Sequence, residues 1–170
     1  VALGANKDIK LTQQRKGNVM YISMNMKNPI FAKPEVREAM KWLIDYQAIN
    51  DSLVKGIGSP HQNFLPQGML GAVDTAPYKL DVAKAKSLLA KAGYPNGFET
   101  TLSFDLGFAT VNEPLCVLVQ ESLGQIGIKC TINKIPGANF RTELNKKVLP
   151  LYTNVFSGWL DYPEYFFIWC

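Results

Sequence analysis

The second half of the chain alternates between strand-like and helix-like patterns, and this alternation restricts the possible folds more than any other feature. Residues 98–104 and 128–135 have strand patterns, and residues 115–126 between them repeat apolar side chains at helical spacing. A short helix over 138–148, with Phe140 and Leu144 pointing inward, and a last strand over 149–156 continue the series. Repeated alternation of this kind predicts an α/β domain whose ligands gather at the carboxyl ends of the strands.

The first part of the chain is expected to form two strands followed by a helix. Strand patterns cover residues 9–14 and 19–26, and a turn-like segment separates them. Apolar residues then recur at helical spacing from Pro34 to Leu53, with the proline suited to a first turn and Gly56 to a stop. The sequence therefore predicts one helix over this stretch.

A long loop is expected between this helix and the next. Residues 56–78 are too rich in glycine and proline for regular structure. Loops of this length are usually functional or braced against another surface. Asp81 is in position to cap a second helix, which Gly93 ends.

Composition and charge narrow the class of protein. The chain has 170 residues, of which 47% are hydrophobic and 19% charged, and this suits one globular domain with a core. The net charge of +4 comes from scattered basic residues, whereas nucleic-acid binding needs clustered ones. No apolar run approaches the roughly 20 residues that cross a bilayer. Nucleic acid is therefore excluded as a partner, and a membrane span is not expected.

The residues that usually carry catalysis or metal binding are sparse. Cys116, Cys130 and Cys170 are too few and too irregularly spaced for a disulfide framework or a zinc site, so buried free thiols are expected. His61 is the only histidine. The motifs of nucleophile elbows, phosphate-binding loops and zinc proteases do not occur. We therefore predict no catalytic residue, no metal site and no cofactor.

The end of the chain indicates a binding site. The last strand runs into Trp159, Asp161 and Tyr162, an aromatic-flanked carboxylate, and residues 165–169 are then aromatic or isoleucine. An apolar ending of this kind needs a surface to cover it. We interpret the chain as a piece of a larger protein.

Six stretches then occur in a characteristic order. They are Val36-Arg37-Glu38-Ala39-Met40 leading to Ile44-Asp45 and Ala48-Ile49; Gly56-Ile57-Gly58-Ser59-Pro60; Leu65-Pro66-Gln67-Gly68-Met69; Ala83-Lys84-Ala85-Lys86-Ser87-Leu88-Leu89 through Ala92-Gly93-Tyr94-Pro95-Asn96-Gly97-Phe98; Leu123-Gly124-Gln125-Ile126-Gly127-Ile128-Lys129; and Gly158-Trp159 before Asp161-Tyr162-Pro163. In this order the chain resembles the dipeptide- and oligopeptide-binding family (family 5) of extracellular solute-binding proteins that serve ABC importers.

This resemblance implies a fold and a domain organisation. Members of the family fold as two lobes that close over a cleft, and residues 1–170 would be one α/β lobe of the type II periplasmic-binding-protein kind, a mixed sheet flanked by helices. Residues 1–27 would be strands near the hinge. Residues 149–170 would be a strand and a cleft segment that leads back to the missing first lobe.

The resemblance also implies a function. The protein would capture a small polar solute, such as a peptide, an opine or a sugar, and deliver it to an ABC permease in the membrane. It would act in the periplasm, or outside the cell as a membrane-anchored lipoprotein. Its mechanism would be hinge closure, in which ligand contacts stabilise the closed state.

The expected site centres on Asp161. In peptide-binding relatives the matching aspartate holds the free amino group, and a charge-assisted hydrogen bond of this kind is worth roughly 1.5 to 3 kcal/mol. Only Leu160 separates Asp161 from Trp159, whereas those relatives usually place two residues there. Trp159 and Tyr162 would form aromatic walls. The competing interpretations are a strand-end cap for the aspartate and interlobe packing for the two rings.

Three further residues are candidates for ligand contact. Asp105 and Phe108 would line the rim, and His61 would contact the ligand from the long loop or else lie at the surface. Some dipeptide-binding relatives hold the ligand carboxylate with an arginine in the segment that matches 105–114, but this chain has none there. A ligand carboxylate would therefore need another partner.

Two other functions stay open from the sequence. Some bacterial transcription factors resemble this family and carry a solute-binding module beside a DNA-binding domain. A carbohydrate-active enzyme could use Asp161 and Glu164 as paired carboxylates.

Overall fold

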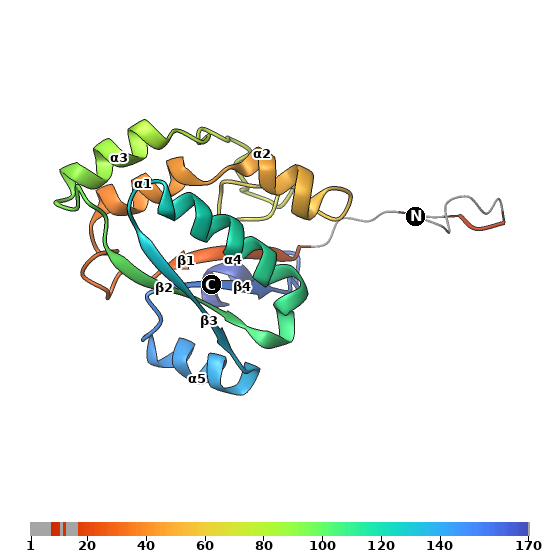
Figure 1. The fold of residues 1–170 in the computed structure, drawn as a ribbon. Helices are drawn as coiled ribbons and strands as arrows, with labels where there is room; N and C mark the ends of the chain where they lie inside the picture. Colours follow the sequence, from red (N-terminus) through yellow and green to blue (C-terminus); the bar gives the residue numbers. More distant parts are fainter. Residues whose placement is uncertain (1–7, 11, 13–16, 170) are drawn as a thin grey trace.

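The computed structural model describes residues 8–10, 12 and 17–169. Within them lies a four-stranded sheet in the order β1-β4-β2-β3 (Figure 1). Strand β2 is parallel to both β3 and β4, whereas β1 is antiparallel to β4. The expected mixed α/β sheet is therefore confirmed. The strands are β1 (Val19–Met24), β2 (Glu99–Asp105), β3 (Lys129–Ile135) and β4 (Leu151–Phe156).

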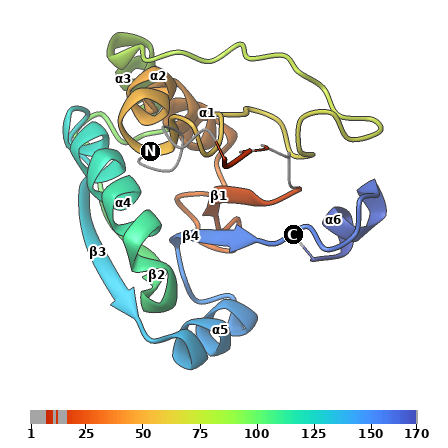
Figure 2. The same cartoon turned by 90° about the vertical axis from the view of Figure 1, so that its right-hand side faces the viewer.

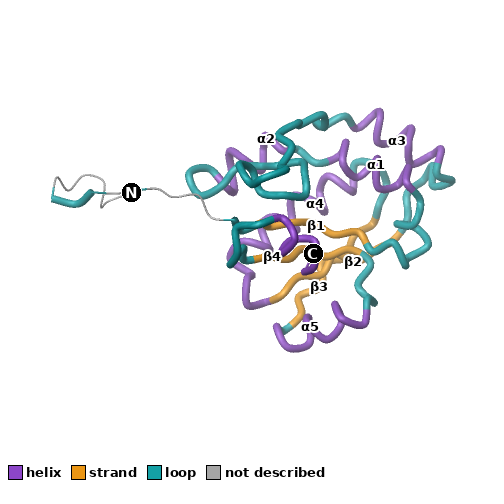
Figure 3. Tube along the Cα trace, turned by 180° about the vertical axis from the view of Figure 1, so that it is seen from behind, coloured by secondary structure: helices purple, strands orange, loops and turns teal. Residues whose placement is uncertain are grey.

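Helices cover both faces of this sheet (Figure 1). Turned by a quarter, the molecule shows α6 beyond the end of β4 (Figure 2). Seen from behind, a long irregular segment joins the α2 region to α3 (Figure 3). The helices are α1 (Pro34–Leu43), α2 (Tyr46–Ile49), α3 (Val82–Lys91), α4 (Ala109–Gly124), α5 (Gly137–Lys146) and α6 (Pro163–Trp169), with a π-helical turn η2 (Asn50–Val54) and a 3-10 turn η3 (Leu106–Phe108).

The main core lies between the sheet and helices α1, α3 and α4. Leu43 of α1, Leu89 of α3 and Leu123 of α4 are fully or almost fully buried there. They pack in one cluster with Leu102 and Leu151 of neighbouring strands. Each fully buried leucine contributes about 1.5–3 kcal/mol relative to an exposed one. The helical layer and the sheet therefore depend on each other for their stability.

A smaller cluster holds α5 to the sheet. Phe140, which was expected to point inward, is 3% exposed and packs with Ile135 and Leu149. Tyr152 of β4 also contacts this cluster, and its ring meets that of Phe140 edge to face. Helix α5 thus fixes the ends of β3 and β4 relative to each other.

The single helix expected from Pro34 to Leu53 is wrong, because the chain breaks at Ile44 and Asp45. Ile44 adopts an extended conformation, and the side chain of Asp45 accepts a hydrogen bond from the backbone N–H of Ala48 at 2.9 Å. An aspartate competes with the helix for backbone N–H groups in this way and starts a new helix. The apolar periodicity misled because Leu53 still packs against the main core.

Other boundaries differ by less. The strand expected over 19–26 is confirmed as β1, and that over 9–14 falls partly outside the described residues; its described positions 9, 10 and 12 are not in a strand. Helix α4 begins at Ala109, earlier than expected, and accommodates Pro114 in its second turn, where one intrahelical hydrogen bond is lost.

Two sequence signals at the second helix are confirmed. The carboxylate of Asp81 accepts a hydrogen bond from the backbone N–H of Lys84 at 2.9 Å and so caps α3. Gly93 follows the helix with a φ of 91°, which favours glycine.

The cysteines follow expectation where the structure describes them. Cys116 and Cys130 are free and buried, and burial raises the pKa of the Cys116 thiol to about 11. Cys170 lies outside the described residues. In the described part of the chain, every helix is too short or too polar to cross a lipid bilayer, and no cluster of three potential metal ligands occurs.

The turn between α3 and β2 tests this fold. Gly97 has a φ of 80°, and a side chain there would overlap the backbone carbonyl of Gly127. We expect Gly97→Ala to destabilise the chain by about 2 kcal/mol or more, measured by urea unfolding. In contrast, Gly124 in α4 has nothing near its Cβ position, so Gly124→Ala should be neutral or stabilising by up to about 1 kcal/mol. If the two substitutions have equal effects on the free energy of unfolding, the close approach of Gly97 to the backbone of Gly127 is contradicted.

Candidate functional site

The end of β4 and the start of β1 lie against each other. Val19 pairs with Phe156 at the last position of the antiparallel ladder, and Gly17 and Gly158 each lie two residues beyond this pair. A side chain at Gly158 would overlap the backbone carbonyl of Gly17. Only glycine allows the two segments to approach this closely. The chain that leaves β4 is therefore directed past β1 toward the long loop.

A hollow of about 730 Å³ opens at this point. It brings together the chain that follows β4 and the segment Pro66–Met69 of the long loop, although almost ninety residues separate them. Trp159 and Asp161, both predicted as ligand contacts, line it, and the indole is 83% exposed. The lining residues are Gly17, Asn18, Pro66, Gln67, Gly68, Met69, Ser157, Gly158, Trp159 and Asp161.

Helix α6 was not expected, and it packs against the long loop. Pro163 takes its first position, which suits a residue without a backbone N–H. Phe166 is 1% exposed and packs with Leu65 and Met69. Of the apolar tail that was expected to need a covering surface, Phe166 is therefore covered by the chain itself. Phe167 and Ile168 are 65% and 75% exposed.

The other predicted ligand contacts do not line this hollow. Tyr162 is 46% exposed, and its ring meets that of Tyr165. Asp105 is the last residue of β2 and accepts a hydrogen bond from the backbone N–H of Gly107 at 2.8 Å, and Phe108 nearby is 48% exposed. In His61 the Nε2 atom is buried and, among the described residues, has no hydrogen-bond partner.

Sequence reasoning missed several residues of the hollow. Gln67 and Met69 belong to a Pro-Gln-Gly-Met stretch, whose Gly68 has a φ of 87° and marks a turn. This signal locates a turn, but it does not say what the turn faces. Asn18 and Ser157 carry no motif, and only the strand pairing places them beside the tryptophan.

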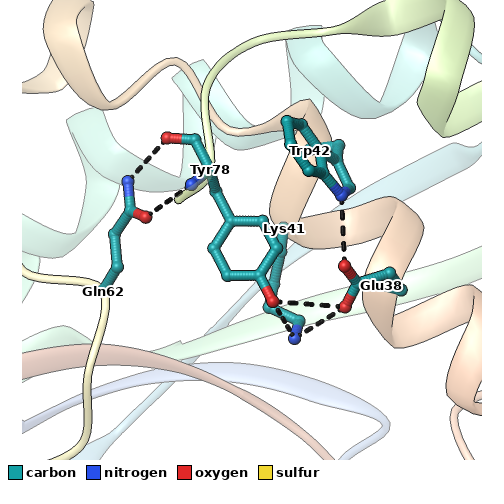
Figure 4. Close-up of polar contacts among 5 residues, drawn as sticks. All are labelled: Glu38, Lys41, Trp42, Gln62 and Tyr78. Carbon is teal, nitrogen blue, oxygen red and sulfur yellow. Dashed lines mark hydrogen bonds and ion pairs between the residues drawn. The ribbon is translucent and has the colours of Figure 1, made fainter. Parts of the chain in front are cut away.

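The long loop is fixed to α1 by a group of polar and aromatic side chains (Figure 4). The hydroxyl of Tyr78 accepts a hydrogen bond from Lys41 at 2.8 Å and donates one to Glu38 at 3.3 Å. Lys41 and Glu38 also form an ion pair at 2.8 Å. Trp42 donates to Glu38 at 3.1 Å and meets the tyrosine ring edge to face. This group holds the Tyr78 end of the long loop, whose residues Pro66–Met69 line the hollow.

Sequence comparison identifies the family. The sequence model of the "Bacterial extracellular solute-binding proteins, family 5 Middle" matches residues 2–170. The chain belongs to this family. As a family 5 protein it is 34% identical over 145 residues to the glutathione-binding protein GsiB of Salmonella choleraesuis (strain SC-B67), and 33% identical to GsiB of Escherichia coli (strain K12). The match covers 85% of this chain and 28% of either GsiB, so the family 5 chain spans less than a third of its curated relatives.

Solved structures agree with the family and the fold. The family 5 chain superposes on the periplasmic binding protein DppA of Helicobacter pylori, solved with a peptide STSA, with a TM-score of 0.81 and 27% identity, covering 89% of this chain and 30% of DppA. It superposes on AgaA of A. tumefaciens R10, solved with agropinic acid, with a TM-score of 0.75 and 32% identity, covering 84% and 30%. These relatives are binding proteins. The expected fold class, a mixed α/β sheet flanked by helices as in type II periplasmic binding proteins of family 5, is thereby confirmed.

The exposure of Trp159 predicts how little this side chain contributes to the stability of the chain. Because its indole is 83% exposed, Trp159→Ala should change the free energy of unfolding of the 170-residue chain by no more than about 0.5 kcal/mol. Phe166→Ala, which empties a buried site, should cost about 3 kcal/mol. Urea unfolding measures both. A large cost for Trp159→Ala would show that this ring packs within the chain.

The attachment of the loop to α1 predicts a dependence on pH. The hydrogen bond from Lys41 is the main cause that lowers the pKa of Glu38; partial burial opposes it, and hydrogen bonds from Trp42 and Tyr78 add to it. A carboxyl group with a lowered pKa stabilises the fold above its unfolded value of about 4.5, and this contribution is lost as the pH falls through the folded pKa.

Glu38→Gln is therefore expected to destabilise the chain at pH 7 and to lose this effect as the pH falls from about 4.5 through the lowered folded pKa, where the wild-type carboxyl group takes up its proton. The difference should stay below about 1 kcal/mol, because the side chains of Lys41 and Glu38 are 39% and 37% exposed. Urea unfolding across this pH range measures it. A difference that grows toward acid pH would contradict the assignment.

Proposed function

We propose that the full-length protein is the substrate-binding component of an ABC importer and captures a small, peptide-like polar solute outside the cytoplasmic membrane. The observation that carries this proposal is the hollow in which Trp159 and Asp161 meet in a family 5 chain. The names of similar proteins agree, since GsiB binds glutathione and DppA was solved with a peptide. A permease in the membrane would receive the solute.

In this proposal the 170 residues form one lobe of a larger receptor. The match to only 28% of GsiB supports this division. The chain would enter the lobe near residues 1–27 and leave it through 149–170, and both connections would lie at the hinge. The contact of Gly17 with Gly158, beside the hollow, suits such a place because a closing cleft needs its connections close together.

The chemistry of the hollow favours a ligand with an ammonium group. Among its described lining residues, Asp161 is the only charged one. Asn18 and Gln67 add amide groups that can donate and accept, and Trp159 offers a flat apolar wall. A carboxylate in this position attracts a cation and repels an anion. The carboxylate groups of a peptide would therefore be held by residues outside this hollow.

Acetylation of the ligand's amino group tests the role of Asp161. In the full-length receptor, glutathione should bind more tightly than N-acetylglutathione by roughly 1.5–3 kcal/mol, about 10- to 150-fold, because acetylation removes the charge-assisted hydrogen bond. With Asp161→Asn the two ligands should bind with similar affinity. Isothermal titration calorimetry measures both, and a panel of dipeptides with free and acetylated amino groups extends the test.

Asp105→Asn is the matched control, because this carboxylate lies outside the hollow. It should leave the preference for the free amino group intact. If Asp105→Asn abolishes the preference and Asp161→Asn does not, the ammonium site is at the end of β2. If the receptor binds no peptide at all, the proposed solute class is wrong.

A further inference from the structure

Hydrogen bonds from side-chain amides join the two ends of the long loop, and we call this part of the loop (residues 62–63 and 75–78) its neck. The Nε2 of Gln62 donates to the backbone carbonyl of Tyr78 at 2.7 Å, and its Oε1 accepts from the backbone N–H of Tyr78 at 2.8 Å (Figure 4). The side chain of Asn63 donates to the carbonyl of Thr75 at 2.6 Å. Two amide side chains thus join the incoming and outgoing limbs of the loop, in the way that a backbone pair joins two strands.

One limb of this neck is fixed to the helical layer. Tyr78 reaches Lys41 and Glu38 through its hydroxyl, and the backbone N–H of Asp81 donates to the carbonyl of Trp42 at 2.8 Å. The ring of Trp42 is also covered by the ammonium of Lys84 at 3.4 Å from the ring centroid. Because α1 belongs to the main core, Tyr78 has a rigid support, and Gln62 transmits it to the other limb.

The segment enclosed by the neck forms the wall of the hollow. It contains Pro66–Met69, held by single turns: the N–H of Met69 donates to the carbonyl of Pro66 at 3.1 Å, and the N–H of Ala72 to that of Met69 at 2.9 Å. Just inside the neck, Phe64 stacks on Phe167 of α6 with ring centroids 5.2 Å apart, and Leu65 and Met69 pack against Phe166 of the same helix. The wall is therefore held at two places, by the neck at α1 and by these contacts with α6.

We propose that Gln62 and Tyr78 are positioning residues that hold the wall 66–69 beside Trp159. Neither lines the hollow, so they would act on the solute only through the wall. Among the described residues, the wall takes part in no ladder of backbone hydrogen bonds. A loop closed at its neck samples fewer conformations than an open one. The consequence for affinity rests on the proposed function, whereas the geometry of the wall does not.

Hydrogen exchange in the full-length receptor tests the neck without a ligand. Gln62→Ala should speed exchange of the Met69 and Ala72 amides about tenfold and leave the amides of β2 unchanged. Gln120→Ala is the matched control, because Gln120 also donates a side-chain amide to a backbone carbonyl, that of Cys130, at 2.6 Å but far along the chain from the loop. It should leave the loop unchanged. Gln62→Glu keeps the acceptor and loses the donor at neutral pH, so it should fall between.

Titration with glutathione then tests the effect on binding, with an expected loss of about tenfold for Gln62→Ala and none for Gln120→Ala. Unchanged exchange at Met69 and Ala72 overturns the proposal. Exchange that becomes faster to the same extent in the loop and in β2 also overturns it, because this result indicates global destabilisation. Faster exchange in the loop with unchanged affinity overturns it as well. If the wild type binds no peptide, the proposed function fails, and the exchange rates still decide whether the neck holds the wall.

Discussion

The pairing of β1 with β4 is the constraint on which the rest of the site depends. Strand β4 lies between an antiparallel and a parallel neighbour, so both of its edges are hydrogen-bonded and its direction is fixed. Its last residue, Phe156, is paired with Val19, and the chain then passes Gly17 in backbone contact at Gly158. Trp159 is therefore placed by the sheet, although its own side chain is exposed.

The other side of the hollow is fixed by packing instead of by a sheet. Leu65 and Met69 bury against Phe166, and burial of this kind is favourable whatever the direction of the contact. Such contacts hold a loop in place less uniquely than a ladder of hydrogen bonds. The hydrogen bonds between Gln62 and Tyr78, and those that hold Tyr78 to α1, add the directional contacts that apolar packing does not provide. The end of a hydrogen-bonded strand thus faces a loop that side-chain contacts hold. In the proposed function, the solute would contact the more rigid strand end on one side and the more mobile loop on the other.

Local signals predicted the elements well where residues close together in sequence decide the structure. The cap at Asp81, the turn at Gly93 and the inward face of Phe140 depend on a few consecutive residues. Local signals misled where two of them conflict. At Asp45 a capping side chain interrupts apolar periodicity, and at Pro114 an apolar helix continues through a residue that usually stops one.

The sequence by itself determined the α/β class, the family resemblance and the chemical types at the chain's end, an aromatic ring beside a carboxylate. It determined them because periodicity and motif order are properties of neighbouring residues. Only the tertiary structure decided that Trp159 and Asp161 share a hollow with Gln67, while Asp105 and Phe108 lie elsewhere. The reason is strand order: β4 is inserted between β1 and β2, and no local pattern encodes which distant segments a strand will face.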